Sequence, residues 1–245
     1  MKILSIIAVA LIGAVEALNA QQASPIPVQL PKPIMVKAPV MSKWLITKTA
    51  AAPKAGQNAA ARPVETLKTL VTKTDKIRHE ATVDASGHKA DTWWDGPNQI
   101  SNSPEWKQAI ISTKSLFDGS YVDYSKTDFP DFEWVSQANF VGTKSVEGKK
   151  CWVFSEKRSS ISEESKAMLE KEGNFNPQQY QFQITAYVDS ETQLPVMLAF
   201  GEDSVKYIFQ PPPAEMLSLP ADIKKALINV TEGQQALRRP PPKPF

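Results

Sequence analysis

Histidines, cysteines and close pairs of carboxylates are the side chains that most often bind metals or carry out catalysis, and this sequence groups few of them. His79 and His88 lie on either side of a predicted turn. If the loop is Asp84–Gly87, His79 falls opposite Thr92, and if the loop is one residue longer, His79 falls opposite Trp93. In neither register do the two histidines face each other, so we expect no zinc site.

The single cysteine and the carboxylates do not form a catalytic set either. Cys151 has no histidine close in the sequence. Because a nucleophilic thiol needs a neighbouring base, we expect a buried strand cysteine. The densest group of carboxylates is spaced as in a solvated loop and a polar strand face, not as a paired acid and base; its members are Asp123, Asp128, Asp131 and Glu133. The sequence also lacks a glycine-rich phosphate loop, so we expect neither an enzyme nor a bound cofactor.

Two adjacent tryptophans, Trp93 and Trp94, are the remaining candidates for contact with a ligand. Neighbouring residues of a strand point to opposite faces of the sheet, so one ring is expected in the core. The other ring either packs under a loop, which is the favoured arrangement, or stays exposed to bind a glycan or a lipid.

The composition is that of an ordinary globular domain with Pro-rich ends. Of the 245 residues, 42% are hydrophobic and 22% are charged, which is the usual balance of a folded soluble chain. A net charge of +2 is too small to indicate nucleic-acid binding. One cysteine cannot form an internal disulfide, so the core alone must hold the domain together.

The first twenty residues predict export. Lys2 precedes an apolar stretch, Ile3–Val15, that is short for a membrane span and typical of a signal peptide. Cleavage is expected after Ala20 or after Ala17, and the alternative is an uncleaved anchor. Since no later stretch approaches the ~20 apolar residues of a membrane helix, we expect a periplasmic or secreted protein without a transmembrane segment.

The chain is expected to divide into four parts. These are a signal peptide at 1–20, a Pro-rich linker at 21–42, a single β domain at 43–233 and a basic Pro-rich tail at 234–245. The linker is either extended and polyproline-like or a plain disordered spacer, and the spacer is favoured. The two Pro-rich ends are the expected contacts for an envelope protein partner.

Alternating polar and apolar residues, separated by turn residues and without alternating helices, favour an antiparallel sheet. The predicted strands are Lys43–Thr49, Thr66–Lys73, Ile77–Val83, His88–Trp94, Asn98–Ser101, Asp131–Val141, Lys150–Ser155 and Val205–Phe209, together with a hairpin at Tyr180–Phe200. In the hairpin, a loop of three or five residues would put most large apolar groups on one face. A five-residue loop would pair Ile184 with Leu198 and Phe182 with Phe200.

Helical signals are fewer and shorter. Ser160–Gly173 is expected to form a helix that begins with a capping box at Ser160 and Glu163 and ends at Gly173. A last helix is expected from Pro220, with Gly233 at its end. Pro104–Ser112 fits a short helix or a strand. The expected fold is therefore mainly β (α+β): a curved antiparallel sheet or half-barrel with two or three short covering helices.

The order of parts in the second half resembles the periplasmic lipoprotein-carrier superfamily, the LolA/LolB-like proteins. The motifs that carry the resemblance are Phe140-Val141-Gly142, Val146-Glu147-Gly148, Lys150-Cys151-Trp152-Val153-Phe154, Tyr187-Val188-Asp189, Leu194-Pro195-Val196 and Tyr207-Ile208-Phe209. They extend over roughly Trp134–Phe209. The resemblance implies an exported half-barrel whose concave apolar face binds a lipid or acyl chain. The Pro-rich N-terminal segment, the Ala-rich stretch Ala50–Pro63 and the basic tail depart from the carriers.

Two functions are consistent with these observations. In the first, an apolar ligand lies on the concave face, against Trp134, Phe140, Trp152, Phe154, Phe182, Ile184, Leu198 and Phe200. In the second, the chain is a non-catalytic envelope interaction or scaffold protein whose own side chains close the same face. A core and a ligand cavity use the same residue types, so the sequence does not separate the two.

Overall fold

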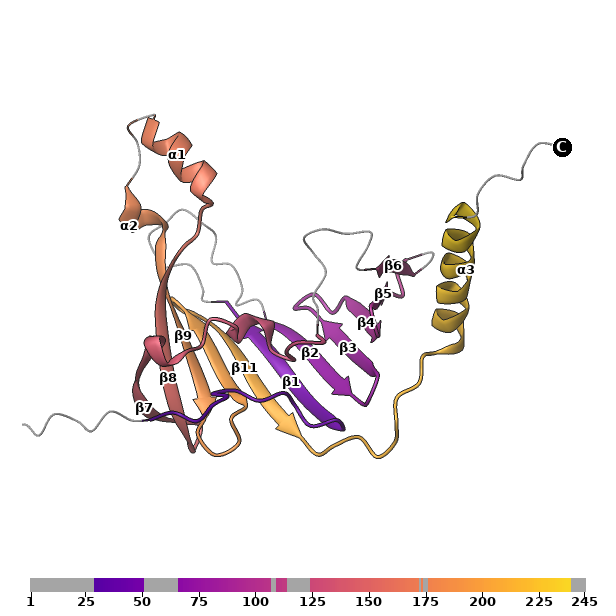
Figure 1. Ribbon diagram of the computed structural model, residues 1–245, viewed down its shortest axis with the longest axis horizontal. Coiled ribbons are helices and arrows are strands. Elements are labelled where there is room, and N and C mark those ends of the chain that lie inside the picture. Colours follow the sequence, from indigo (N-terminus) through magenta and orange to yellow (C-terminus); the bar gives the residue numbers. More distant parts are fainter. Residues whose placement is uncertain are drawn as a thin grey trace, which may run out of the picture. The chain divides into compact units, whose positions relative to one another are not determined.

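The computed structural model describes residues 29–50, 66–106, 109–113, 124–171, 173 and 176–238 (Figure 1). The predicted signal peptide, most of the Ala-rich stretch Ala50–Pro63 and the last seven residues of the basic tail lie outside these ranges. The chain clusters into two compact units, Met1–Pro31 and Lys32–Phe245. The fold and the sites described below belong to the second unit.

The described residues form one open antiparallel sheet of eleven strands, in the order β6-β5-β4-β3-β2-β1-β11-β10-β9-β8-β7. Their bounds are β1 Ser42–Thr49, β2 Thr66–Lys73, β3 Ile77–Val83, β4 Lys89–Asp95, β5 Asn98–Asn102, β6 Ile110–Thr113, β7 Phe140–Val146, β8 Lys149–Ser159, β9 Gln181–Asp189, β10 Pro195–Phe200 and β11 Asp203–Gln210. The mainly β class is confirmed. Because β6 and β7 do not pair with each other, the sheet is not closed into a barrel.

The sheet consists of two meanders joined through the first and last strands. β1 to β6 pair in sequence, β7 to β11 pair in sequence, and β1 pairs with β11, with Trp44 opposite Phe209. The chain must therefore cross from the β6 edge to the β7 edge between these two runs. Residues 124–139 are the described part of that crossing, and we call them the strap. They include two short 3-10 helices, η1 (Pro130–Phe132) and η2 (Gln137–Asn139).

The strap corrects the strand predicted at Asp131–Val141. In the structure β7 begins at Phe140, and the residues before it bend through tight turns. The amide of Phe132 donates to the carbonyl of Phe129, and the amide of Val135 donates to that of Phe132. The alternation of apolar residues in this stretch comes from aromatic side chains turned toward the sheet, a pattern that resembles a strand in sequence.

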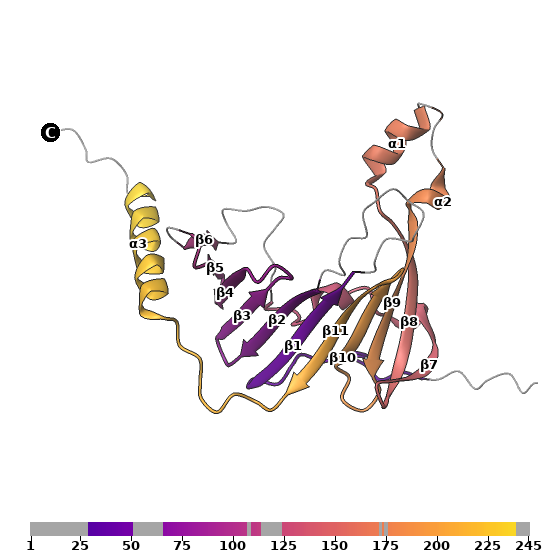
Figure 2. The same cartoon turned by 180° about the vertical axis from the view of Figure 1, so that it is seen from behind.

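The described residues also form three α-helices outside the sheet: α1 (Glu163–Lys171), α2 (Pro177–Tyr180) and α3 (Ala221–Arg238). Both α1 and α2 belong to the β8–β9 connection, beyond the ends of those strands (Figures 1 and 2). None of the helices in the described ranges is long and apolar enough to span a membrane.

The helix ends differ in part from the predictions. The amide of Ser165 donates to Oγ of Ser162, so Ser162 caps α1 in place of the predicted Ser160. Gly173 has the left-handed conformation expected of a C-cap, with φ of 73°. The predicted stop at Gly233 is wrong, because α3 continues to Arg238. An interior glycine costs a helix only about 1 kcal/mol, so neighbouring residues can carry the helix past it.

The hairpin prediction is right in parity and wrong in register. Five residues, 190–194, separate β9 from β10, as the odd-loop expectation required. However, Ile184 lies opposite Phe200, and Leu198 lies opposite Ala186. A bulge between Pro195 and Met197 shifts the pairing, because an extra residue on one strand changes the partner of every residue that follows it. Ile184 and Leu198 still share one buried face.

The β3–β4 hairpin has the longer of the two predicted loops. Val83 pairs with Lys89, so His79 lies opposite Trp93. The two rings stack with centroids 3.9 Å apart. Trp94 points to the other face and is buried, as expected for one of two adjacent tryptophans.

Cys151 is buried in β8, which confirms the expectation of a strand cysteine. Burial raises the pKa of its thiol, and the nearby Asp189 carboxylate raises that pKa further. Since the thiolate is the reactive form, we expect the folded protein to react with a thiol reagent at neutral pH at least about tenfold more slowly than the urea-unfolded chain. Absorbance of released thionitrobenzoate measures both rates. Equal rates would show that Cys151 is accessible in the folded state.

Candidate functional site

The strap lies on one face of the sheet, which we call the strap face. Cross-strand pairing aligns Phe154, Ala186, Leu198, Val205 and Lys48 on this face, from β8 through β9, β10 and β11 to β1. Most of these side chains are apolar and buried. The face therefore offers an apolar floor on the β8–β11 side.

Aromatic contacts hold the strap against the middle of this face. Phe129 is buried, and its ring centroid lies 5.7 Å from that of Trp44 in β1 and 6.1 Å from that of Tyr207 in β11. Phe132 adds an edge-on contact with Tyr207 at 5.4 Å. The sequence predicted covering helices; the cover seen on the middle of this face is this irregular segment.

A cluster of four charged residues lies next to Phe129, in which Asp128 and Arg78 are buried and Lys73 and Glu80 are half-buried. Asp128 accepts a 2.6 Å hydrogen bond from Nζ of Lys73, and its other carboxylate oxygen lies 3.6 Å from the Arg78 guanidinium. Arg78 also pairs with Glu80 at 2.6 Å and stacks over the ring of Tyr124 at 3.7 Å. The expectation that Asp128 belongs to a solvated loop is wrong, since its side chain is 1% exposed. Buried carboxylates are tolerated when such partners surround them.

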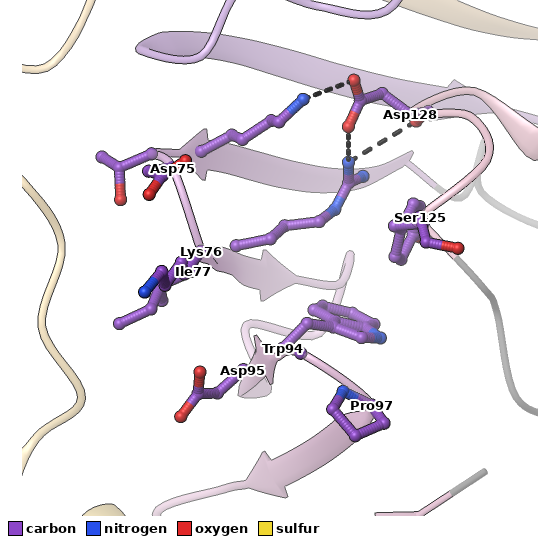
Figure 3. Close-up of a pocket in the computed structure, with 13 residues that line it drawn as sticks. Asp75, Lys76, Ile77, Trp94, Asp95, Pro97, Ser125 and Asp128 are labelled. Carbon is purple, nitrogen blue, oxygen red and sulfur yellow. Dashed lines mark hydrogen bonds and ion pairs between the residues drawn. The ribbon is translucent and has the colours of Figure 1, made fainter.

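Beside this cluster is a cavity of about 470 Å³, shown in Figure 3. Trp94 and Pro97 lie at one side of it and Asp128 at another, with dashed lines marking the ion pairs of Asp128. The Trp94 and Tyr124 rings meet edge to face at 5.1 Å. Burial, followed by the Glu80 carboxylate, raises the pKa of Tyr124, so its phenol stays neutral and packs as part of the wall.

A second cavity, the groove, lies where the strap passes over β8 to β11. Its volume is about 510 Å³, within the range of small-molecule sites. Five of the eight residues predicted from the sequence line it: Trp134, Phe182, Ile184, Leu198 and Phe200. Trp134 belongs to the strap and the other four to β9 and β10, so apolar side chains line the groove from both sides.

The other three predicted residues lie on the sheet but do not line the groove. Phe140 begins β7 and packs against Phe154 with ring centroids 5.7 Å apart. Phe154 is fully buried. Trp152 precedes Phe154 by two residues in β8 and pairs with Val188 of β9. Of the three, Phe154 belongs to the core, and Phe140 and Trp152 are half-buried.

The sequence analysis missed two charged residues of the groove, Lys48 and Arg158, and assigned the other two, Asp131 and Glu133, to a solvated loop and a polar strand face. Lys48 from β1 and Arg158 from β8 line it together with Asp131 and Glu133 of the strap. The guanidinium of Arg158 lies 5.4 Å from the ring centroid of Trp134. Arg158 sits two strand positions past Glu156 on the same face, and a longer β8 would have revealed it, but the predicted strand ended at Ser155.

The described part of the chain contains no group of three or more histidine, cysteine, aspartate and glutamate side chains that could hold a metal ion. His79 Nε2 lies 2.7 Å from Asp91, and His88 lies 3.1 Å from Asp84. Each histidine thus has its own carboxylate partner, and the two rings belong to separate clusters.

Comparison with known proteins finds a likeness of fold and no match in sequence. No protein-family model matches the chain, and no curated protein matches it. Among solved structures, lipoprotein LppX of Mycobacterium tuberculosis is 8% identical, with 72% of this chain and 89% of that chain covered and a TM-score of 0.36. LprF from Mycobacterium bovis is 10% identical over 75% of this chain and 90% of that chain, with a TM-score of 0.33.

A LolA superfamily protein from Nitrosomonas europaea is also similar, with 11% identity over 77% of this chain and 94% of that chain and a TM-score of 0.30. The resemblance expected from the motifs in Trp134–Phe209 is thus found as a weak likeness of fold.

Proposed function

We propose that the chain binds a lipid or another amphipathic ligand with its acyl chain in the groove. The observation that supports this proposal is the lining of the groove, where apolar side chains from the strap face apolar side chains from β9 and β10. Phe182 is 36% exposed, and large apolar groups on two facing walls mark a surface suited to an apolar partner.

The energetics fit a moderate affinity. Each buried methylene contributes about 0.8 kcal/mol, so roughly ten methylenes give micromolar affinity after the cost of association. The charged residues around the groove, Lys48 and Arg158 with Asp131 and Glu133, would contact the polar end of the ligand. None of the residues in this arrangement suggests a reaction, so we propose a binding protein.

The exported location expected from residues 1–20 belongs to the same proposal. A lipid-binding protein of the cell envelope would meet its ligand at or near a membrane, and the Pro-rich ends would contact an envelope partner. N-terminal sequencing of the mature protein should give a start near Gln21 or Leu18. A chain that retains Met1 in the cytoplasm would contradict this part.

Titration with a long-chain fatty acid that carries an environment-sensitive fluorophore tests the groove. We expect saturable binding by the wild-type chain. Phe182→Ala removes one large side chain from the β9–β10 side of the groove and should weaken binding roughly tenfold, since burying such a side chain is worth about 1.5–3 kcal/mol.

Ile208→Ala is the matched control. Ile208 lies on β11, is 44% exposed, and follows Tyr207 of the strap face, so it points to the opposite face. Its substitution should leave the affinity unchanged. Saturable binding weakened equally by both substitutions would place the ligand elsewhere. A wild-type chain that binds nothing would favour the scaffold function, with the groove filled by movement of its own side chains.

A further inference from the structure

The Pro-rich segment, defined here as residues 32–41, makes specific contacts with the strap. The amide of Ala38 donates a 3.0 Å hydrogen bond to Oδ2 of Asp128, and the carbonyl of Ala38 accepts one from Nζ of Lys73 at 3.3 Å. Nζ of Lys37 donates to the carbonyl of Ser125. Ala38 is 4% exposed. Both backbone groups of this residue are therefore tied to the charged cluster below the strap.

The same segment also runs along the strap and reaches the β9–β10 turn. Pro33, Ile34 and Met35 face Phe132 and Val135 of the strap across a cavity of about 500 Å³. The amide of Val36 donates to the carbonyl of Gln193 at 3.3 Å, and Nε2 of Gln193 donates to the carbonyl of Pro33 at 3.2 Å. The Pro-rich segment thus joins the strap to the turn that precedes β10.

Asp128 lies where these contacts converge. One of its carboxylate oxygens accepts from both the Ala38 amide and Lys73, and the other faces Arg78. Two residues later the strap begins to line the groove, at Pro130. The Asp128 carboxylate thus anchors the strap two residues before its first groove-lining residue.

We infer that Asp128 is a positioning residue that couples the Pro-rich segment to the groove. Its carboxylate holds the strap over the sheet while the Ala38 amide holds the segment against that carboxylate. A partner that pulls the segment away removes one of the hydrogen bonds to Asp128, loosens the strap and speeds release of the ligand. The release step depends on the proposed lipid binding, whereas the coupling between segment and strap does not.

Ala38→Pro tests the coupling without altering Asp128. Proline lacks the backbone N–H, so this change removes the hydrogen bond to Asp128 and keeps the Lys73 and Arg78 pairs. A hydrogen bond to a charged group contributes enough that its loss should speed local opening roughly tenfold or more. Hydrogen exchange of the full-length chain, followed by mass spectrometry of peptides from 124–139, measures that opening. The dissociation rate of the fluorescent fatty acid should rise by a similar factor.

Ala38→Ser is the matched control, because it retains the N–H, and both rates should stay near those of the wild-type chain. Asp128→Asn removes the charge and should speed exchange in 124–139 and in 32–41 together. If Ala38→Pro leaves exchange in 124–139 unchanged, the coupling is refuted. If exchange rises in Ala38→Pro while the wild-type chain binds no fatty acid, the coupling stands and the proposed function fails.

Discussion

Phe129→Ala is expected to lower the free energy of unfolding by about 3–5 kcal/mol. Phe129 is 2% exposed, and its ring meets those of Trp44, Tyr207 and Phe209. Removing it leaves a cavity at the middle of the sheet. Because Asp128, the preceding residue, is held by Lys73 and Arg78, the strap backbone cannot move in to fill that cavity.

Urea denaturation followed by tryptophan fluorescence measures this loss. Phe182→Ala is the matched control, since it makes the same chemical change at a residue that is 36% exposed. We expect Phe182→Ala to lower the free energy of unfolding by about 1 kcal/mol or less, because Phe182 buries less apolar surface in the folded protein than Phe129 does. Similar costs at the two positions would show that the strap does not pack on Trp44 as described.

Arg78→Ala is expected to cost a similar amount, about 3–5 kcal/mol, because removing one member of a buried ion pair leaves its partners without compensation. The Arg78 side chain is 6% exposed and lies between the carboxylates of Glu80 and Asp128. It also contacts the rings of Trp44 and Tyr124. In Arg78→Ala the carboxylates of Glu80 and Asp128 would repel each other, and Lys73 would be the one cation of this cluster left to neutralise them.

Arg158→Ala provides the comparison for Arg78. The Arg158 side chain is 38% exposed and pairs with Glu156 at 3.4 Å, and exposed ion pairs contribute about 0–1 kcal/mol. Chemical denaturation of both variants under the same conditions gives the difference. A loss below about 1 kcal/mol for Arg78→Ala would mean that water reaches the cluster and screens it.

Strands with local signals could be predicted from the sequence, and the crossing between the two meanders could not. β2 and β3 match their predicted bounds because alternation and turn residues specify a hairpin within about twenty residues. The strap has the same alternation in Phe132 and Trp134, yet its conformation depends on Trp44 and Tyr207, which are distant in sequence. No local pattern carries that information.

The residues of the groove also divide into those with a local sequence signal and those without one. Phe182, Ile184, Leu198 and Phe200 were placed on one face from period-2 alternation, and they line the groove. Trp134 joins them from the strap, although it was predicted on a strand. Lys48 was missed because a charged residue on a strand is most simply assigned to solvent, and Arg158 was missed because the predicted strand ended at Ser155. The bulge at Pro195 was missed as well, since nothing in the sequence of that turn requires an extra residue.

The pairing of β1 with β11 has a consequence for the order of events during synthesis. Trp44 meets Phe209 across the middle of the sheet, so the central ladder joins segments from opposite ends of the chain. Such a long-range contact forms slowly, because the entropy of closing a large loop is lost before the contact is made. During synthesis from the N-terminus, β1 emerges long before β11, so the edge of β1 that pairs with β11 stays unpaired. The nascent chain is most prone to aggregate in the interval before β11 is made. A chaperone that binds exposed strand edges would act in that interval.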